Sequence, residues 1–413
     1  MNGLVIIGAS YAGIHAALSV REAGYSENIT IVCDESWLPY ERPPLSKDFL
    51  LGKATENHLI LRDETFFKDR KIDVLLDTRV AKIDRLARRI ETHGGALRFG
   101  KLLIATGSRA RRLAVPGGDL EGICYLRSIT DAIYLRAQLL RATDVVIVGG
   151  GFIGLEVASS AVRLGKKVTV IESASRLLER AVCQLVSDVL HQMHQEAGVD
   201  VRVRDTIMSI DGNHGKVAGV TLSNGERLRA DLILVGIGGI ANDELAVGTG
   251  LTCANGIVVD EYGRTNDPDI HAAGDCASHY SRFADRWIRL ESVQNAQDQG
   301  KTAGLAVAGR AQPYDAVPRF WSDQHDTKLQ MVGLSSCGDD LVVRGSVETG
   351  MFSVFHYRKG ALVAVDSINR PGDQMVSRRL ISAGVSPRPD EAIDESFDLK
   401  SLAKTIEKTG ARA

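Results

Sequence analysis

Closely spaced cysteines are absent from this 413-residue sequence. Its six cysteines stand far apart, and no Cys-x-x-Cys or metal-ligand spacing occurs among Cys33, Cys124, Cys183, Cys253, Cys276 and Cys337. Isolated cysteines are usually buried, reduced thiols, which is how we interpret all six. The pattern therefore excludes a reductase that works through a redox-active disulfide, and it predicts no metal site.

Long apolar runs and a strong net charge are also missing. No run approaches the roughly 20 apolar residues of a transmembrane helix, and no basic region of a signal peptide precedes the first apolar segment. We therefore expect a cytoplasmic protein without membrane association. A formal net charge of −2 and a pI near 6.6 argue against nucleic acid as a partner. The length allows two or three domains.

Two similar units are present, each an apolar strand followed by a glycine-rich loop and a helix. The strands cover residues 4–7 and 145–148, about 140 residues apart. Roughly 20 residues past each loop a carboxylate closes the next apolar run, Asp34 in the first unit and Glu172 in the second. There the carboxylate can accept hydrogen bonds from a ribose. The pattern predicts a pair of dinucleotide sites.

The glycines in these loops have separate roles. Gly8 and Gly149 allow a tight turn, Gly151 lets phosphates approach the backbone, and Gly13 and Gly154 let the helix pack on the strand. The free N–H groups at the start of each helix then face a pyrophosphate. One such loop also fits an ordinary βαβ unit. Two together favour a flavoenzyme that takes hydride from a nicotinamide and passes it to FAD.

One loop residue departs from this pattern, and the rest of the chain suggests a duplication. Ser10 stands where a second glycine is usual; its Cβ crowds the phosphate path, while its hydroxyl can donate to a phosphate oxygen. The apolar runs 101–105 and 231–236 look equivalent, as expected if one nucleotide-binding design occurs twice. From about residue 318 the pattern predicts antiparallel strands with turns at Gly350 and Gly360, then a helix over 374–383.

Several motifs together resemble one family over nearly the whole chain: the FAD-dependent ferredoxin reductases of bacterial oxygenase systems, of the putidaredoxin reductase and rhodocoxin reductase type. The motifs are Arg-Pro-Pro-Leu-Ser-Lys at 42–47, Ala-Thr-Gly at 105–107, Ala-Gly-Asp-Cys at 273–276, Arg-Leu-Glu-Ser-Val-Gln-Asn-Ala at 289–296 and Phe-Trp-Ser-Asp-Gln at 320–324.

The resemblance implies an α/β fold like that of glutathione reductase. Two Rossmann-type dinucleotide-binding domains would be followed by a C-terminal α/β interface domain. The expected boundaries are residues 1–111 and 241–316 for the FAD domain, 112–240 for the NAD domain and 317–413 for the interface domain.

The resemblance also implies a reaction and three catalytic residues. NADH would reduce FAD, and the flavin would pass single electrons to a two-iron two-sulfur ferredoxin that serves a haem monooxygenase or Rieske oxygenase. Lys47 would lie beside the isoalloxazine and stabilise the reduced flavin. Glu156 would lie near the nicotinamide, and Trp321 near the flavin edge that faces the ferredoxin. The protein would be a monomer or homodimer.

Further residues would bind the cofactors. Those expected at FAD are Gly8, Ser10, Ala12, Gly13, Asp34, Arg42, Lys47, Val80, Thr106, Gly107, Arg127, Gly274, Asp275, Glu291, Ser292, Val293 and Trp321. Those expected at NADH are Gly149, Gly151, Ile153, Gly154, Glu156 and Glu172. Because ferredoxins of such systems are acidic, the basic residues expected at the partner surface are Lys301, Arg319, Arg378 and Arg379; the family often has tryptophan at 319.

Simpler interpretations stay open for four of these residues. Lys47 is also compatible with a solvated lysine, Asp275 with a helix cap, Glu156 with a first-turn acid that meets the helix dipole, and Trp321 with plain core. Two other functions remain as alternatives. An NADH:quinone reductase would need an amphipathic membrane helix, for which residues 401–408 are too polar and short. A binding flavoprotein like apoptosis-inducing factor would need a basic surface.

Overall fold

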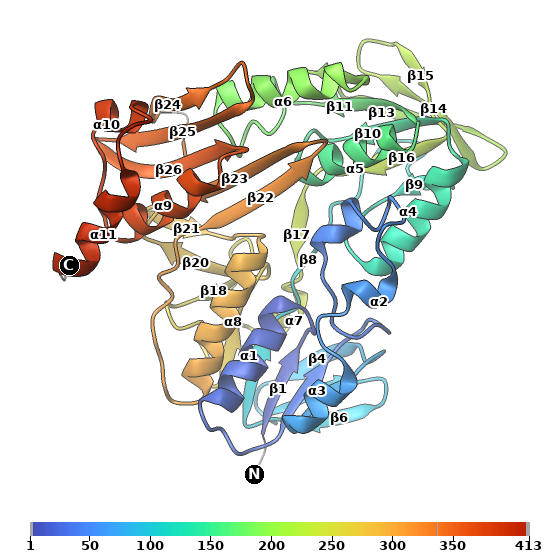
Figure 1. Ribbon diagram of the computed structural model, residues 1–413. Helices are drawn as coiled ribbons and strands as arrows, with labels where there is room; N and C mark the ends of the chain where they lie inside the picture. Colours follow the sequence, from blue (N-terminus) through green and yellow to red (C-terminus); the bar gives the residue numbers. More distant parts are fainter. Residues whose placement is uncertain (1–2, 337, 410–413) are drawn as a thin grey trace. The chain divides into compact units, whose positions relative to one another are not determined.

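The computed structural model describes residues 3–336 and 338–409 (Figure 1). The chain forms two compact units, each assembled from separate segments. The first contains Met1–Glu41, Asn57–Arg109 and Gly239–Pro318, and the second contains Arg42–Glu56, Ala110–Gly238 and Arg319–Ala413. Residues 42–56 belong to the second unit because η1 (Pro43–Ser46) packs on helices α4 (Ile129–Arg141) and α5 (Phe152–Arg163). The domain boundaries given above remain predictions.

The first unit is built on a five-stranded parallel sheet in the order β19-β7-β1-β2-β3. Its strands are β1 (Leu4–Ile7), β2 (Ile29–Val32), β3 (Ile72–Leu75), β7 (Lys101–Ile104) and β19 (Ile270–Ala272). All four residues of β1 are buried, as the unbroken apolar run predicts for a strand covered on both faces. Helices α1 (Tyr11–Glu22) and α8 (Val293–Val307) lie side by side in this unit (Figure 1).

Smaller elements complete the first unit. One antiparallel sheet contains β4 (Val80–Asp84), β5 (Arg89–Thr92) and β6 (Gly95–Arg98), and another sheet contains β18 (Ile257–Val259), β20 (Ala277–Ser281) and β21 (Arg286–Ile288). The short strands β8 (Ser108–Ala110) and β17 (Gly239–Ala241) pair with each other. The short helices are α2 (Glu56–Leu59), α3 (Glu64–Asp69) and α7 (Glu244–Val247).

The second unit repeats the parallel sheet in the order β12-β11-β10-β16-β9. Its strands are β9 (Ile123–Cys124), β10 (Asp144–Val148), β11 (Lys167–Glu172), β12 (Val199–Val203) and β16 (Leu232–Val235). β16 pairs with β10 as β7 pairs with β1, so the predicted equivalence of these two strands is confirmed. Helix α6 (Gln184–Glu196) follows β11, and β13 (Ile207–Asn213), β14 (Lys216–Leu222) and β15 (Arg227–Arg229) form an antiparallel sheet.

The same unit also holds an antiparallel sheet in the order β22-β23-β26-β25-β24 (Figure 1). Its strands are β22 (Arg319–Gln324), β23 (Thr327–Gly333), β24 (Asp340–Ser346), β25 (Met351–Arg358) and β26 (Ala361–Ile368). The predicted turns at Gly350 and Gly360 are confirmed, with positive φ at both. The predicted helix is α9 (Pro371–Ser382), which begins three residues earlier because a proline opens its first turn. Helices α10 (Pro389–Ile393) and α11 (Leu399–Thr409) follow.

No helix among the described residues is long and apolar enough to cross a membrane.

Arg344 on β24 binds the end of α10 and the residues that follow this helix. Its side chain is 5% exposed and donates to the carbonyl oxygens of residues 392, 394, 395 and 397 over 2.5–3.2 Å. We expect Arg344→Leu to lower the free energy of unfolding by about 3 kcal/mol, because four carbonyl acceptors, all of them buried or partly buried hydrogen-bond partners, lose their donor. Urea unfolding followed by circular dichroism measures this change. The exposed Arg378→Leu is the control, and equal stability of the two variants would contradict the assignment.

Candidate functional sites

The first glycine loop has the geometry that a dinucleotide loop requires. Gly8 has φ +113°, and a Cβ there would lie 2.2 Å from the carbonyl oxygen of Ala105. A Cβ at Gly13 would lie 2.0 Å from the carbonyl oxygen of Gly8, so no other residue fits without backbone movement. Helix α1 begins at Tyr11, and the side chain of the preceding Ser10 makes no capping hydrogen bond. The first-turn N–H groups are therefore not capped by the Ser10 hydroxyl.

The second loop repeats this geometry. Gly149 has φ +106°, and a Cβ there would lie 2.5 Å from the carbonyl oxygen of Gly236. A Cβ at Gly154 would lie 2.2 Å from the carbonyl oxygen of Gly149. Gly151 is different, because the nearest atom to a Cβ there is 3.9 Å away. Space over Gly151 and the start of α5 fits the approach of a pyrophosphate.

The acid of the second unit lies directly against its loop. The Glu172 carboxylate accepts hydrogen bonds of 2.7 Å from the N–H groups of Gly150 and Ala174. The Gly149 N–H donates to the residue before Glu172, so the acid is level with the turn glycine. Its remaining lone pairs are available to a ribose hydroxyl at the place that the sequence predicts.

The acid of the first unit is offset by one residue. The residue level with Gly8 is Cys33, whose sulfur accepts a 3.4 Å hydrogen bond from the Glu35 N–H. Burial raises the pKa of the Cys33 thiol. Asp34 is exposed and lies one position beyond. The expectation that Asp34 and Glu172 occupy the same place is therefore wrong, because counting about 20 residues cannot distinguish adjacent positions.

Asp275 lies among polar partners in the first unit. It is 9% exposed, the Ser108 hydroxyl donates to its carboxylate over 3.1 Å, and Arg289 donates to its carbonyl oxygen. The chain continues into β20 at Ala277 rather than into a helix, so Asp275 is not a helix cap. Thr106 is held by two hydrogen bonds with Asn242.

The remaining candidates for FAD divide between the two units. In the first, Ala12 and Val80 are buried in α1 and at the start of β4, and Ser292 caps α8 by accepting from the Asn295 N–H. Other candidates in that unit are Gly107, Gly274, Glu291 and Val293. In the second unit, Arg42 donates to the carbonyl oxygen of Arg127 over 2.7 Å. The candidates Lys47 and Trp321 also belong to the second unit.

Glu156 is the centre of a buried polar cluster in the second unit. It is 6% exposed, and its Oε2 accepts from Lys47 Nζ at 2.8 Å and from the Ser46 hydroxyl at 2.5 Å. Its Oε1 accepts from the Ser322 hydroxyl at 2.7 Å. Glu156 is the fifth residue of α5, so the first-turn interpretation is wrong; Lys47 is an ion-pair partner rather than a solvated lysine. The arrangement holds one positive charge at a fixed place.

Strand alternation in β22 separates two kinds of side chain. Ser322 and Gln324 are buried on one face of β22. The side chain of Trp321 lies on the opposite face, where it is 36% exposed, so Trp321 is not a core residue. Phe320 packs against Phe152 of α5 with ring centroids 4.4 Å apart. Ile153, predicted at NADH, is 43% exposed on the first turn of α5. These contacts tie β22 to the second nucleotide-binding unit of the fold.

The polar partners of Glu156 are not evident from the sequence. Ser46 and Ser322 lie inside the family motifs next to Lys47 and Trp321, for which the resemblance implies roles, but it implies none for the two serines. Nothing local marks a serine hydroxyl as a partner of a carboxylate more than 100 positions away.

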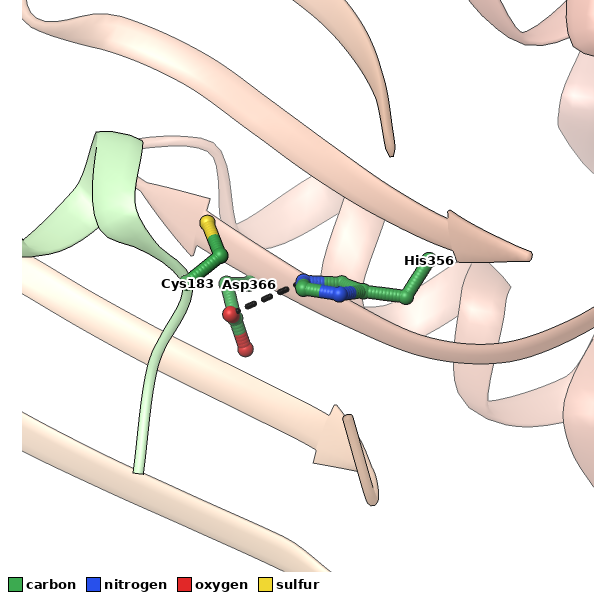
Figure 2. A group of neighbouring side chains, drawn as sticks. All are labelled: Cys183, His356 and Asp366. Carbon is green, nitrogen blue, oxygen red and sulfur yellow. Dashed lines mark hydrogen bonds and ion pairs between the residues drawn. The ribbon is translucent and has the colours of Figure 1, made fainter. Parts of the chain in front are cut away.

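A second cluster joins Cys183, at the start of α6, to His356 of β25 and Asp366 of β26 (Figure 2). One possible ligand atom from each residue lies within 4.8 Å of the others, and His356 Nε2 is 3.0 Å from Asp366. A metal on Nε2 would leave the proton on Nδ1, which has no partner among the described residues. Metal-ligating histidines almost always donate that proton. The structure therefore favours His356 as a hydrogen-bond partner of Asp366 rather than as a metal ligand.

Three buried histidines are expected to make the free energy of unfolding depend on pH. Burial lowers the pKa of His194, His271 and His279 to about 4. Because this lies below the unfolded value of 6.5, each histidine stabilises the fold fully above pH 6.5, and the contribution is lost as pH falls toward 4. We expect a loss on the order of 1–2 kcal/mol for each histidine at pH 5.

Urea unfolding at pH 7.5 and pH 5 measures this loss. Both ring nitrogens of His271 lack partners among the described residues, so His271→Leu should reduce the difference between the two pH values without breaking a hydrogen bond. An unchanged difference in that variant would contradict the assignment.

Two family models together match most of the chain. The family model for pyridine nucleotide-disulphide oxidoreductase matches residues 2–300, and the reductase C-terminal model matches residues 319–403. The chain is 42% identical to rhodocoxin reductase of Rhodococcus erythropolis over 96% of this chain and 93% of that protein.

Two solved structures are similar over their whole length. The ferredoxin reductase for the CYP199A2 system from Rhodopseudomonas palustris has a TM-score of 0.95 and 41% identity, covering 98% of this chain and 100% of that one. The reductase in the covalent putidaredoxin reductase–putidaredoxin complex has a TM-score of 0.94 and 39% identity, covering 100% and 99%. The fold class and the family resemblance predicted from the motifs are confirmed.

Proposed function

Because the chain belongs to the pyridine nucleotide-disulphide oxidoreductase family, we propose that it is an FAD-dependent NADH:ferredoxin oxidoreductase. The observation that carries the proposal is the pair of glycine loops with matching geometry, in a chain that is similar throughout to rhodocoxin reductase and to a ferredoxin reductase of known structure. When bound, FAD takes a hydride from NADH and releases the electrons one at a time. We propose a two-iron two-sulfur ferredoxin as the acceptor and a monomer or homodimer as the working form.

The residues of each unit fit a dinucleotide. In the first, Gly8, Gly13 and the start of α1 would hold the FAD pyrophosphate, with Asp34 and Asp275 as polar partners. In the second, Gly151 and Glu172 would hold NADH. Lys47, held by Glu156, would supply a fixed positive charge that stabilises a reduced, anionic flavin.

The cysteines support an external electron acceptor. All the cysteines that the structure describes are unpaired, and burial raises the pKa of Cys124 to about 12 and of Cys253 to about 11. Thiols of this kind are poor nucleophiles. Electrons are therefore expected to leave from the flavin to a partner rather than through a thiol pair.

Anaerobic mixing of the purified protein with NADH tests this function. We expect acid to release FAD in near one-to-one ratio, and NADH to bleach the flavin. Subsequent addition of a ferredoxin should restore the oxidised spectrum with reduction of the iron–sulfur cluster. A protein that takes up no FAD would sink the proposal, and so would one that passes electrons only to a quinone in vesicles. Retention on DNA without NADH turnover would favour the binding-protein alternative.

Glu172 predicts a preference for NADH over NADPH of at least about tenfold in kcat/KM, or roughly 1.4 kcal/mol. The carboxylate is already fixed by two backbone N–H groups, so it cannot readily turn away from a 2′-phosphate. Steady-state assays with both nucleotides measure the ratio. Glu172→Gln should lower it by removing the repulsion, whereas equal efficiency of both nucleotides in the wild type would refute the assignment.

A further inference from the structure

The polar cluster around Glu156 continues as a chain of hydrogen bonds through the second unit. The Ser322 hydroxyl donates to Glu156 over 2.7 Å, and Gln324 Nε2 donates to Ser322 over 3.0 Å. Gln324 Oε1 lies 2.9 Å from His194 Nε2, and His194 Nδ1 lies 3.2 Å from His325 Nε2. We call these four residues, Ser322, Gln324, His194 and His325, the support chain.

We propose that the support chain positions Glu156, and through it Lys47, for the transfer of hydride from NADH. This inference rests on the proposed function. The four residues of the support chain are positioning residues that act through Glu156.

The carboxylate at one end sets the direction of every bond in the support chain. A carboxylate only accepts, so Ser322 must donate to Glu156 and accept from the Gln324 amide. The amide oxygen then faces His194, which must carry its proton on Nε2 and accept on Nδ1. His325 must therefore donate from Nε2. Only one arrangement of the donors satisfies all four contacts.

Burial makes this arrangement costly to break. Ser322 and His194 are 0% exposed and Gln324 is 1% exposed. A buried polar group that loses its partner costs about 1–3 kcal/mol, so a cut at one link disturbs its neighbours. Burial also lowers the pKa of His194 to about 4, which keeps the ring neutral and the donor pattern unchanged near neutral pH.

The last residue of the support chain, His325, lies in the hairpin turn between β22 and β23. Gln324 pairs with Thr327, so His325 and Asp326 form a two-residue turn, in which His325 has φ +51°. Glycine or asparagine is the usual choice for this conformation. The turn is tied to α5 because the His325 N–H donates to the Ser159 hydroxyl and Asp326 pairs with Arg163. The strained backbone of His325, held in place by these contacts, suggests that this residue does more than form the turn.

The support chain is suited to positioning rather than to proton conduction. A neutral amide such as that of Gln324 does not readily exchange its donor and acceptor ends. The support chain holds Oε1 of Glu156 in place, so that Oε2 stays turned toward Lys47 and Ser46. Without it the carboxylate can rotate, and the Lys47 ammonium moves with it.

Single-turnover reduction of the flavin by NADH tests the proposal. We expect Ser322→Ala and Gln324→Leu each to slow flavin reduction about tenfold with a small change in NADH affinity, since misplaced groups cost rate rather than binding. The double variant should be no slower than either single variant, because one cut already interrupts the chain. Ser322→Thr keeps the hydroxyl and should stay within about twofold of the wild type.

A matched control lies on the same helix as His194. Ser187 is 0% exposed on α6, and its hydroxyl donates to the Leu177 carbonyl oxygen over 2.6 Å. Ser187→Ala therefore removes a buried serine hydroxyl that is not part of the support chain. It should leave the rate of flavin reduction unchanged.

Nitrogen-15 NMR of the imidazoles gives a readout that needs no turnover. Wild-type His194 should show the Nε2–H tautomer near pH 7, and Glu156→Gln should shift its ring nitrogens although the two side chains do not touch. This measurement stands even if Ser322→Ala fails to fold.

Either of two results overturns the proposal. In the first, NADH reduces the flavin of the wild type and of the Ser322→Ala and Gln324→Leu variants at the same rate. In the second, the ring-nitrogen shifts of His194 do not change in the Glu156→Gln variant. A wild type that NADH does not reduce would instead refute the proposed function.

Discussion

Replacing Gly13 by alanine is expected to give a colourless protein, whereas replacing Gly154 is expected to give a yellow protein that NADH can no longer reduce. A Cβ at either position would lie 2.0 or 2.2 Å from a backbone carbonyl oxygen of its own loop, so the loop must move. Each change should therefore remove one nucleotide and spare the other. For each nucleotide we expect a loss of at least about 100-fold in affinity, or roughly 2.7 kcal/mol.

The absorbance spectrum, FAD content and stopped-flow reduction by NADH measure this separation. Dithionite should still reduce the flavin of the Gly154→Ala variant, because it needs no nucleotide site. Gly151→Ala is the matched control: a Cβ there meets no protein atom closer than 3.9 Å. It should fold normally and weaken only NADH. If Gly13→Ala kept its FAD, or if Gly154→Ala lost it, the assignment of the two loops would be wrong.

The parts of the fold that could be predicted from the sequence depend on local pattern. An unbroken apolar run followed by glycines predicts strand, turn and helix, and β1 and β10 lie where those runs are. Gly350 and Gly360 marked two hairpins for the same reason. α9 begins at Pro371 rather than at residue 374, because proline fits the first turn of a helix, a signal that the apolar pattern does not contain.

The parts of the site that could not be predicted depend on contacts between distant segments. The one-residue offset of Asp34 follows from the register between β1 and β2, which a loop-to-acid distance of about 20 residues does not determine. Ser322 reaches Glu156 across 166 positions, and His194 reaches Gln324 across 130. Serine, glutamine and histidine have common structural roles, so their types alone carried no signal. The motifs indicate which segments form the site, whereas the packing of distant segments determines which side chains become partners of Glu156.

Reversing the charge of Lys301 or of Arg319 is expected to slow reduction of the ferredoxin about tenfold or more at low salt. The proposed function requires two-electron chemistry at the flavin to become one-electron delivery to a ferredoxin. If that ferredoxin is acidic, as the family resemblance implies, attraction between opposite charges would speed the encounter by about 10–1000-fold. A net charge of −2 means that any attraction must come from local groups. Lys301 is exposed on α8, and Arg319 opens β22, two residues before the exposed Trp321.

The measurement is the rate of ferredoxin reduction by Lys301→Glu and Arg319→Glu over a series of salt concentrations, with ferricyanide as the control acceptor. At 0.1 M salt the interaction between exposed charges more than about 10 Å apart is largely screened, so the wild type should slow as salt rises, and the variants should respond less. Ferricyanide reduction should hardly change, because that small oxidant needs only NADH turnover at the flavin. Arg378→Glu and Arg379→Glu extend the series to α9. If ferricyanide and ferredoxin activities fall together, these residues act on folding or on flavin chemistry, and they do not form the docking surface.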